Sequence, residues 1–268
     1  MRQKFTKKAL AKKLGLSRSS LYYRSKKTEA DWQVKILIEK AMSDRPGYGY
    51  RRIARQLKIN KKKAQRVMQL FGIRAYRRRG RKYKRNRAKN DVIYPNLLLT
   101  EIPRSPNQIW ASDFTEIHWR QTKLFLATVI DLFSREIVGF ALMTNHSAAL
   151  VLQSLFVALH GHRRPLIFHS DNGREYISKI FVEALKRLGI LISRSHPGRP
   201  WENGYQEGFY SQFKNDLGDP NRFGSLGELV YEINRLIYDY NHGRIHSAIK
   251  MPPRLFAERH QKVLEKVS

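Results

Sequence analysis

The hydrophobic pattern changes its period partway along the chain. Before residue 74, apolar residues recur every three to four positions, which predicts short helices within 6–24 and at 30–42, 51–57 and 61–71. From Asn107 onward, β-branched and aromatic runs at hairpin spacing predict strands at 109–117, 124–132 and 136–143. Beyond them the two periods alternate, and they predict helices at 147–159, 177–188, 202–215 and 225–240 around strands at 165–169 and 190–193. The chain therefore begins with helices alone and continues as a domain that mixes strands and helices.

Turn and cap signals divide the helical part into two modules. Gly15 breaks the first pair of helices and Ser17 can cap its second member, whereas Asn60 and Gly72 mark the start and the end of the last helix. Each pair predicts a helix-turn-helix, although the alternative for the first pair is a basic helical hairpin that binds nothing specific. We therefore expect a helix-turn-helix at residues 1–28, a second helical module at 29–73, a basic linker at 74–102 and the mixed domain at 103–268.

The order of elements in the mixed domain predicts its fold, and its acidic residues predict a site. Three consecutive strands, then a helix, a strand, a helix, a strand and further helices, predict an α/β fold with a five-stranded mixed sheet that resembles ribonuclease H. Asp113 lies in the first strand, Asp171 follows the fourth, and Glu207 lies on a helix. Carboxylates that converge from separate elements can bind two Mg²⁺ or Mn²⁺ ions for phosphoryl transfer. Lys214 follows Glu207 by two helical turns and is expected near the same face.

Positive charge is concentrated in the first hundred residues. The chain carries a formal net charge of +30, and residues 1–100 hold 31 Lys and Arg against 5 Asp and Glu. This asymmetry predicts a polyanionic partner, foremost nucleic acid. Residues 74–89 hold ten Lys or Arg and no acid, which predicts an arm along phosphates, although a nuclear-localisation run has the same composition. The residues expected to contact DNA in this part are Arg18, Arg51, Arg52, Lys61, Lys62, Lys63, Arg66, Arg77, Arg78, Arg79, Arg81 and Lys82.

Composition excludes several other classes of protein. The chain has no cysteine, which excludes disulfides and cysteine-based zinc sites. The first residues have no apolar core for a signal peptide, and no apolar run approaches the ~20 residues of a membrane helix. We therefore expect a cytoplasmic protein with no membrane partner.

Five motifs follow one another in order along the mixed domain. They are Trp110-x-x-Asp113-x-Thr115, the run 129–139, His169-Ser170-Asp171-Asn172-Gly173-x-x-Tyr176, Asn203-Gly204-x-x-Glu207-x-Phe209 with Lys214, and Tyr240-Asn241-x-x-Arg244-x-His246-Ser247. With the stretch 48–53, they make residues 40–258 resemble the DDE transposases of the insertion-sequence-three family and, more distantly, retroviral integrases. The resemblance implies that Asp113, Asp171 and Glu207 bind the metal ions, and that Lys214 and Arg244 contact DNA.

The resemblance also implies an activity and a set of partners. It implies a bacterial, nucleoid-associated enzyme that cleaves DNA at terminal inverted repeats and transfers the strand into target DNA, working as a homo-multimer through a circular intermediate. Because the chain lacks a leucine-zipper heptad run, it resembles a second-frame product that has a first-frame helix-turn-helix and leucine-zipper polypeptide as partner. Two other readings are a non-catalytic DNA-binding regulator and a ribonuclease H-like nuclease that cuts without joining.

Several polar residues near the motifs have a structural reading beside a functional one. His169 can position water near the metals or be a packed, hydrogen-bonded histidine. Asn172 and Asn203 can support the metal ligands from behind or cap helices. Asp131 is expected to accept hydrogen bonds in a tight turn rather than to bind metal.

Overall fold

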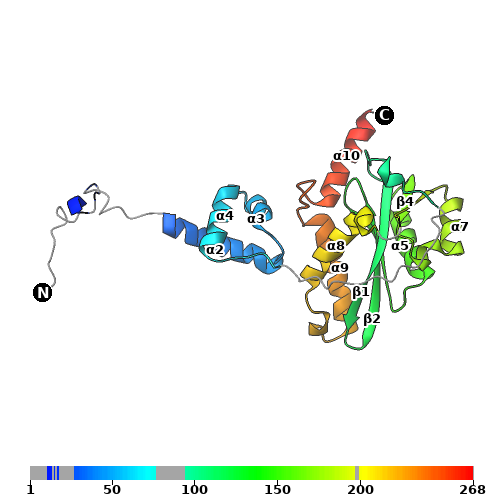
Figure 1. Ribbon diagram of the computed structural model, residues 1–268, viewed down its shortest axis with the longest axis horizontal. Coiled ribbons are helices and arrows are strands. Elements are labelled where there is room, and N and C mark those ends of the chain that lie inside the picture. The colour runs from blue at the N-terminus through cyan, green and yellow to red at the C-terminus, as the bar shows by residue number, and fades with distance from the viewer. Residues whose placement is uncertain are drawn as a thin grey trace. The chain divides into compact units, whose positions relative to one another are not determined.

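The computed structural model describes residues 11–13, 15, 17, 27–76, 94–196 and 199–267. The chain divides into two compact units, Met1–Ala75 and Tyr76–Ser268, which are drawn in Figure 1. The first predicted helix-turn-helix lies largely outside the described residues. So do six residues from the set of predicted DNA contacts, namely Arg18, Arg77, Arg78, Arg79, Arg81 and Lys82.

In the first unit, three helices enclose a small core. They are α2 (Lys27–Asp44), α3 (Tyr50–Gln56) and α4 (Lys61–Leu70), close to the predicted bounds. The Asn60 side chain caps α4 by accepting a hydrogen bond of 2.8 Å from the Lys62 amide. Gly72 follows the helix at φ +66°, a left-handed conformation that glycine adopts without a steric penalty. The sequence signals for the start and the end of α4 are thus confirmed.

The second unit is built on one mixed sheet of five strands in the order β3-β2-β1-β4-β5. The strands are β1 (Ile109–Trp119), β2 (Thr122–Asp131), β3 (Ile137–Met143), β4 (Ile167–Ser170) and β5 (Leu191–Arg194). The first three pair antiparallel as a meander, and β4 and β5 join them in parallel. This topology confirms the predicted ribonuclease H-like fold.

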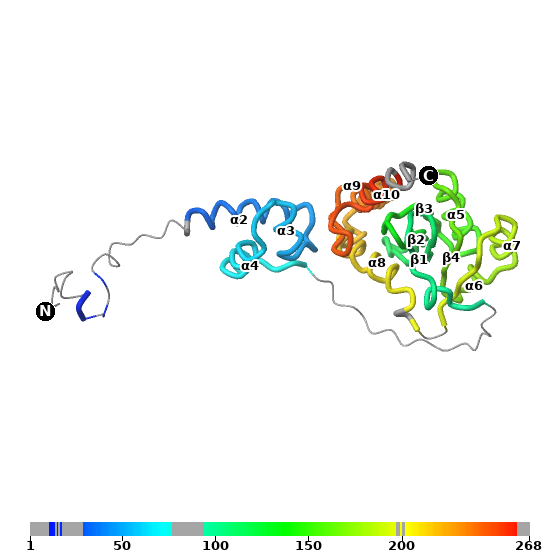
Figure 2. The backbone as a smooth tube through the Cα atoms, turned by 90° about the horizontal axis from the view of Figure 1, so that it is seen from above, coloured from blue at the N-terminus to red at the C-terminus, as the bar shows by residue number. Residues whose placement is uncertain are grey.

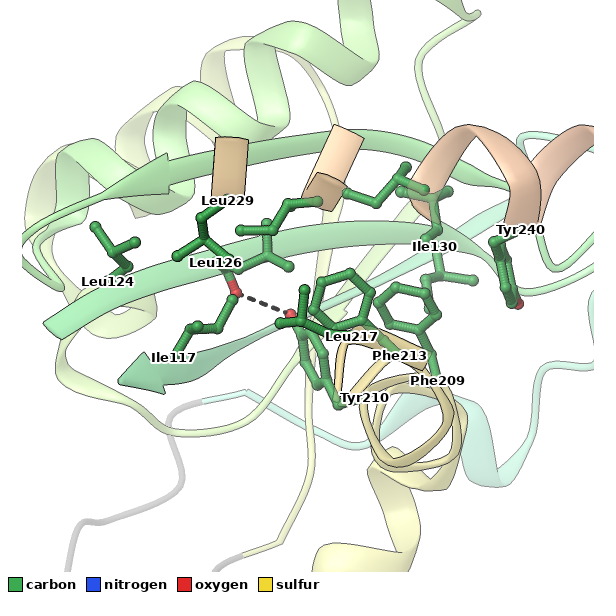
Figure 3. Packing of buried hydrophobic residues seen from close by; sticks show 13 residues of the cluster. Ile117, Leu124, Leu126, Ile130, Phe209, Tyr210, Phe213, Leu217, Leu229 and Tyr240 are labelled. Carbon is green, nitrogen blue, oxygen red and sulfur yellow. Dashed lines mark hydrogen bonds between the residues drawn. The ribbon is translucent and has the colours of Figure 1, made fainter. Parts of the chain in front are cut away.

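Helices cover both faces of the sheet, as Figures 1 and 2 show. One face carries α5 (Ala148–Gly161) and α7 (Lys179–Arg187), and the other carries α8 (Gly204–Leu217) and α9 (Leu226–His242). The core on the α8 side, drawn in Figure 3, joins strand residues such as Leu126 to Phe209 and Phe213 of α8. A further helix, α10 (Pro253–Val267), follows and was not predicted.

A glycine sets how closely α5 approaches β3. A Cβ atom at Gly139 would lie 2.6 Å from the Ala158 amide nitrogen and 2.7 Å from the Ala158 Cβ atom. Both distances are shorter than van der Waals contact, so only glycine fits between this strand and the helix. Val151, Leu155 and Ala158 consequently sit fully buried on the sheet.

Two segments differ from the sequence prediction. The helix predicted at 177–188 is α7, which begins at Lys179, and a short helix that was not predicted, α6 (Arg174–Ile177), precedes it. Ser178 between them is non-helical (ψ 140°), and its hydroxyl donates to the Glu175 carbonyl. The end of the predicted linker, from Tyr94 through the short helix η2 (Leu97–Leu99), packs against the sheet unit instead of lying apart from it. Within the residues described, no helix has both the length and the apolar character needed to cross a bilayer.

Candidate active site

The strand register brings two of the predicted acids together. Ala111 of β1 pairs with His169 of β4 in parallel, and Asp113 and Asp171 each follow two residues later. Asp113 is still within β1, whereas Asp171 lies directly past the last residue of β4, so the pairing of the two strands brings the segments that carry these aspartates side by side. Both side chains are half-buried. Burial raises the pKa of the Tyr176 hydroxyl, and the negative charges of Asp113 and Asp171 add to this rise.

Helix α8 is fixed over this position by the two buried residues that bracket the third acid. Gln206 donates to the Ala111 carbonyl at 2.7 Å and to the Thr128 carbonyl at 3.2 Å. Tyr210 donates to the Asp113 carbonyl at 2.6 Å and to the Leu126 carbonyl at 3.2 Å, the second of which Figure 3 shows. These bonds set the depth and the rotation of the helix above β1 and β2.

Glu207 lies between these two anchors and is itself unengaged. Its side chain is exposed, and its carboxylate makes no hydrogen bond or ion pair with any residue that the structure describes. Asp113, Asp171 and Glu207 together supply only carboxylate oxygens, the ligand type that Mg²⁺ and Mn²⁺ prefer. In the described part of the chain, no three His, Asp or Glu side chains are gathered closely enough to hold a metal ion. The donor types thus fit a divalent cation, while the side chains are not drawn into a closed ligand set.

A buried arginine supports the loop that carries Asp171. Arg194 of β5 is 1% exposed, and its guanidinium donates to the Asp171 carbonyl at 3.2 Å and to the Tyr176 carbonyl at 2.6 Å. Burial lowers the pKa of Arg194, but a guanidinium with an ordinary pKa above 12 stays charged near neutral pH. This role of Arg194 could not be predicted from the sequence, because an arginine at the end of a strand usually points to solvent.

Short-range bonds shape the same loop. The Gly173 amide donates to Asp171 Oδ1 at 2.9 Å, and a Cβ atom at Gly173 would lie 2.9 Å from that oxygen. A side chain at this position would therefore push the Asp171 carboxylate aside. Asn172 donates from Nδ2 to the Ser195 carbonyl at 2.7 Å, which ties the loop to the end of β5.

His169 and Asn203, the two remaining polar residues near the acids, differ in their hydrogen bonding. His169 is fully buried, and its Nδ1 atom lies 2.9 Å from Ser193 Oγ, while its Nε2 atom has no hydrogen-bond partner within the described chain. This environment is that of the packed, hydrogen-bonded histidine. Asn203 precedes α8 but makes no side-chain cap bond, and both polar atoms of its buried amide lack a partner among the described residues. It lies one helical turn before Glu207.

Acidification is expected to destabilise the metal-free fold through His169. Burial lowers the pKa of His169 to about 4, whereas the unfolded imidazole titrates near 6.5. Because the unfolded chain binds the proton first, the stability present above pH 6.5 is lost as the pH falls towards 4, by an amount on the order of 3 kcal/mol. Urea unfolding in EDTA at pH 7.0, 5.5 and 4.5 measures this loss. His169→Gln should show a smaller loss between pH 7.0 and 4.5, and an equal loss in both proteins would contradict the assignment.

The predicted DNA contacts are found in unlike surroundings. Lys61 and Lys62 are exposed at the start of α4, and Arg51 is exposed on α3. Lys214 is half-buried, and its charge, after those of Lys123 and His118, helps to lower the pKa of Glu116.

Three further cations from the prediction are engaged inside their own units. Arg66 makes two bonds of 2.6 Å to the buried Asp31, with half of its side chain exposed, and Arg52 lies over the Tyr48 ring. Arg244 is only 4% exposed and forms an ion pair with Asp216. We therefore correct the expectation for Arg244, because this guanidinium joins α8 to the chain beyond α9 rather than facing outward.

Asp131 accepts the hydrogen bonds that the turn reading predicts. Its Oδ1 atom accepts from the Ser134 amide at 2.7 Å and from the Ser134 hydroxyl at 2.8 Å, and its Oδ2 atom accepts from the Asn107 amide at 2.7 Å. Burial nevertheless raises the pKa of this carboxyl. Asp131 thus closes the β2–β3 turn.

Fold and site together define an integrase-type catalytic core of the ribonuclease H class. The integrase core domain family matches residues 103–200, and a second integrase core domain family matches residues 188–253. Among solved structures, the catalytic core of HTLV-2 integrase in complex with magnesium has a TM-score of 0.50 at 20% identity, covering 57% of this chain and 98% of that one. A simian T-cell lymphotropic virus intasome chain has a TM-score of 0.52 at 19% identity, covering 82% of this chain and 74% of that one. These likenesses establish the fold.

Curated relatives narrow the class to transposases. The putative transposase InsK of element IS150 from Escherichia coli is 30% identical over 93% of this chain and 92% of its own length. The transposase of element IS904 from Lactococcus lactis is 33% identical over 71% of this chain and 77% of its own length. The chain belongs to the insertion-sequence-three family of DDE transposases. It is therefore a protein of DNA transposition.

Proposed function

We propose that Asp113, Asp171 and Glu207 hold two Mg²⁺ ions, and that the chain cleaves DNA at the ends of its element and joins the freed strand to target DNA. The observation that carries this proposal is that neighbouring, directly joined elements carry the three acids. Asp113 lies on β1, Asp171 directly follows the paired strand β4, and the bonds of Gln206 and Tyr210 to β1 hold the helix of Glu207 against that strand.

The division of labour follows from the residues around the acids. When bound, the two ions supply activation of the attacking oxygen and stabilisation of the leaving oxygen. Asp113, Asp171 and Glu207 hold the ions. The buried amide of Asn203, whose polar atoms have no partner among the described residues, is available to bind water or phosphate one helical turn before Glu207. Lys214, on the same helix as Glu207, contacts the DNA backbone.

The two steps require no covalent bond between protein and DNA. In the first, water attacks a phosphodiester, and the bond to the 3′ oxygen breaks to leave a 3′ hydroxyl. In the second, that hydroxyl attacks a phosphodiester of the target in line, and the strand on the far side of the phosphorus leaves with its own 3′ hydroxyl. The protein's part is to hold both DNA segments in register with the acids.

The helical unit and the arm supply DNA binding. The exposed lysines at the start of α4, Lys61 and Lys62, lie where a helix N-terminus approaches phosphates, and Arg51 adds charge on α3. We further propose that two or more copies act together on paired element ends, as the intasome named above is an assembly of this fold. The first-frame polypeptide stays a prediction.

The test is a cleavage and joining assay on DNA that carries the sequences flanking the coding region in its source. A labelled duplex of such an end, incubated with the protein and Mg²⁺ or Mn²⁺, should be nicked at the end to leave a 3′ hydroxyl and then appear joined to an unlabelled target duplex. EDTA should stop both steps without preventing DNA binding. Nicking without joining in either metal would favour a nuclease, and binding without chemistry would favour a non-catalytic regulator.

A further inference from the structure

A buried carboxylate at the entrance to α8 connects three segments of the chain. Glu202, in the short helix η3 (Pro200–Asn203), has a side chain that is 5% exposed. It accepts hydrogen bonds from Asn96 Nδ2 at 2.7 Å and from the His196 amide at 2.7 Å, and it also contacts the His196 ring and Arg199. Asn96 Nδ2, the His196 amide and the Arg199 guanidinium are all donors, so the oxygens of this carboxylate act as their acceptors.

We propose that Asn96 and Glu202 are a positioning pair that sets the location of Glu207 relative to Asp171. This inference rests on the function proposed above, in which both acids hold the metal ions. Glu202 lies five residues before Glu207, and η3 runs directly into α8. A displacement of Glu202 is therefore passed on to the first turn of the helix that carries Glu207.

The Asn96 side of the pair is rigid because both ends of its side chain and both neighbouring peptides are engaged. Its Oδ1 atom accepts from the Leu98 amide at 3.0 Å, which leaves Nδ2 directed at Glu202. The Leu97 amide donates to Ser193 Oγ at 2.9 Å, and the Arg194 amide donates to the Pro95 carbonyl at 3.0 Å. Asn96 is thus fastened to β5 on either side.

The same contacts lead to the loop that holds Asp171. Ser193 Oγ, which accepts from Leu97, lies 2.9 Å from His169 Nδ1, two residues before Asp171. The Arg194 guanidinium, which supports the Asp171 loop, lies over the Tyr94 ring at 5.3 Å. One short segment, Tyr94–Leu97, therefore contacts the supports of Asp171 and, through Asn96, the support of Glu207.

The ionisation of Glu202 agrees with this role. Burial alone would raise the pKa of Glu202, but hydrogen bonds from His196 and Asn96 outweigh it and lower the pKa below its usual range. A carboxylate kept charged in a buried position costs desolvation free energy, which an apolar contact would avoid. In return, the arrangement provides hydrogen bonds to Glu202 that have a fixed length and direction.

The experiment compares Asn96→Ala, Glu202→Gln and the double variant in the full chain. Mn²⁺ binding without DNA is followed by calorimetry, and Mn²⁺-dependent nicking of the labelled end is followed separately. Each single variant should weaken Mn²⁺ binding and slow nicking about tenfold, as loss of a residue that orients metal ligands does. The double variant should lose less than the sum of the two single losses, because Asn96→Ala removes and Glu202→Gln weakens the same bond. DNA binding should stay within twofold of the wild type.

Glu232→Gln is the matched control. Glu232 also binds an arginine, at 2.7 Å from Arg235 Nε, but it lies on α9 outside this network, so its variant should keep wild-type Mn²⁺ binding and nicking. Glutamine has nearly the same shape as glutamate. Glu202→Gln therefore tests the positioning role if the Asn96→Ala variant does not fold.

The possible outcomes distinguish a failure of the positioning role of Asn96 and Glu202 from a failure of the proposed function. Wild-type Mn²⁺ affinity and nicking in Glu202→Gln, beside an inactive Glu207→Gln, would overturn the positioning role alone. Full activity in Glu207→Gln would overturn the proposed function instead.

Discussion

Glu207→Gln is expected to reduce nicking and joining by roughly a thousandfold or more while leaving the fold and DNA binding intact. The reason is that this carboxylate is exposed and makes no bond with the described residues, so it contributes little to stability and is free to bind metal. The free energy of unfolding of the variant should lie within about 0.5 kcal/mol of the wild-type value, as is usual for a surface substitution. Rates on the labelled element end and urea unfolding curves measure the two quantities.

Glu183→Gln is the control for the loss of one exposed helical carboxylate. Glu183 lies on α7 with 48% of its side chain exposed and faces Lys179 at 3.9 Å. Its variant should keep both the wild-type rate and the wild-type stability. Equal rates in Glu207→Gln and Glu183→Gln would show that the acid on α8 has no part in the chemistry.

Gly139→Ala is expected to destabilise the sheet unit by about 3 kcal/mol, at the upper end of the range for overpacking. The new methyl group would meet the Ala158 amide nitrogen and Cβ atom at 2.6 and 2.7 Å, and one of these atoms belongs to the α5 backbone. A backbone cannot rotate aside as a flexible side chain can, so the helix itself has to move away from Val129 and Val138 of the sheet.

Gly161→Ala tests the same chemical change where the structure has space. Gly161 ends the same helix, and a Cβ atom there meets nothing within 4 Å. The free energy of unfolding of this variant should lie within about 1 kcal/mol of the wild-type value, or slightly above it, because alanine is the better helix former. The urea midpoints of the wild type, Gly139→Ala and Gly161→Ala are compared. A wild-type midpoint in Gly139→Ala would mean that α5 does not approach β3 closely enough to exclude a methyl group.

The order of elements was predictable because each run carries its own period. The strand at 109–117 was predictable from its β-branched and aromatic residues, and the cap at Asn60 was predictable because it is a local hydrogen bond. The short helix α6 was not predicted because four residues are too few to show a helical period. The start of α10 at Pro253 had a signal, since proline is favoured in the first helical turn.

The acids of the site were predictable, and their supports were not. Asp113, Asp171 and Glu207 stand in motifs whose residues are close in sequence, so the resemblance could find them. Asn96 and Glu202 are 106 positions apart, and the sequence around one residue contains no pattern that predicts a contact with the other. Arg244 shows the opposite error, because its motif suggested an outward cation and the packing against Asp216 buries it. Local pattern predicts chemistry that is local, while long-range hydrogen bonds appear only in the folded chain.

The two outer strands of the sheet bear on how this protein avoids aggregation. At β3, Asn241 presents its side-chain amide as a neighbouring peptide would, donating to the Ile137 carbonyl and accepting from the Ile137 amide, each at 2.9 Å. At β5, the Arg194 amide is taken by Pro95, a residue that has no amide proton to offer further. Exposed strand edges recruit strands from other molecules, and a basic protein that accumulates along DNA reaches high local concentrations. These two contacts occupy the backbone groups of Ile137 and Arg194, so neither position can pair with a strand of another copy.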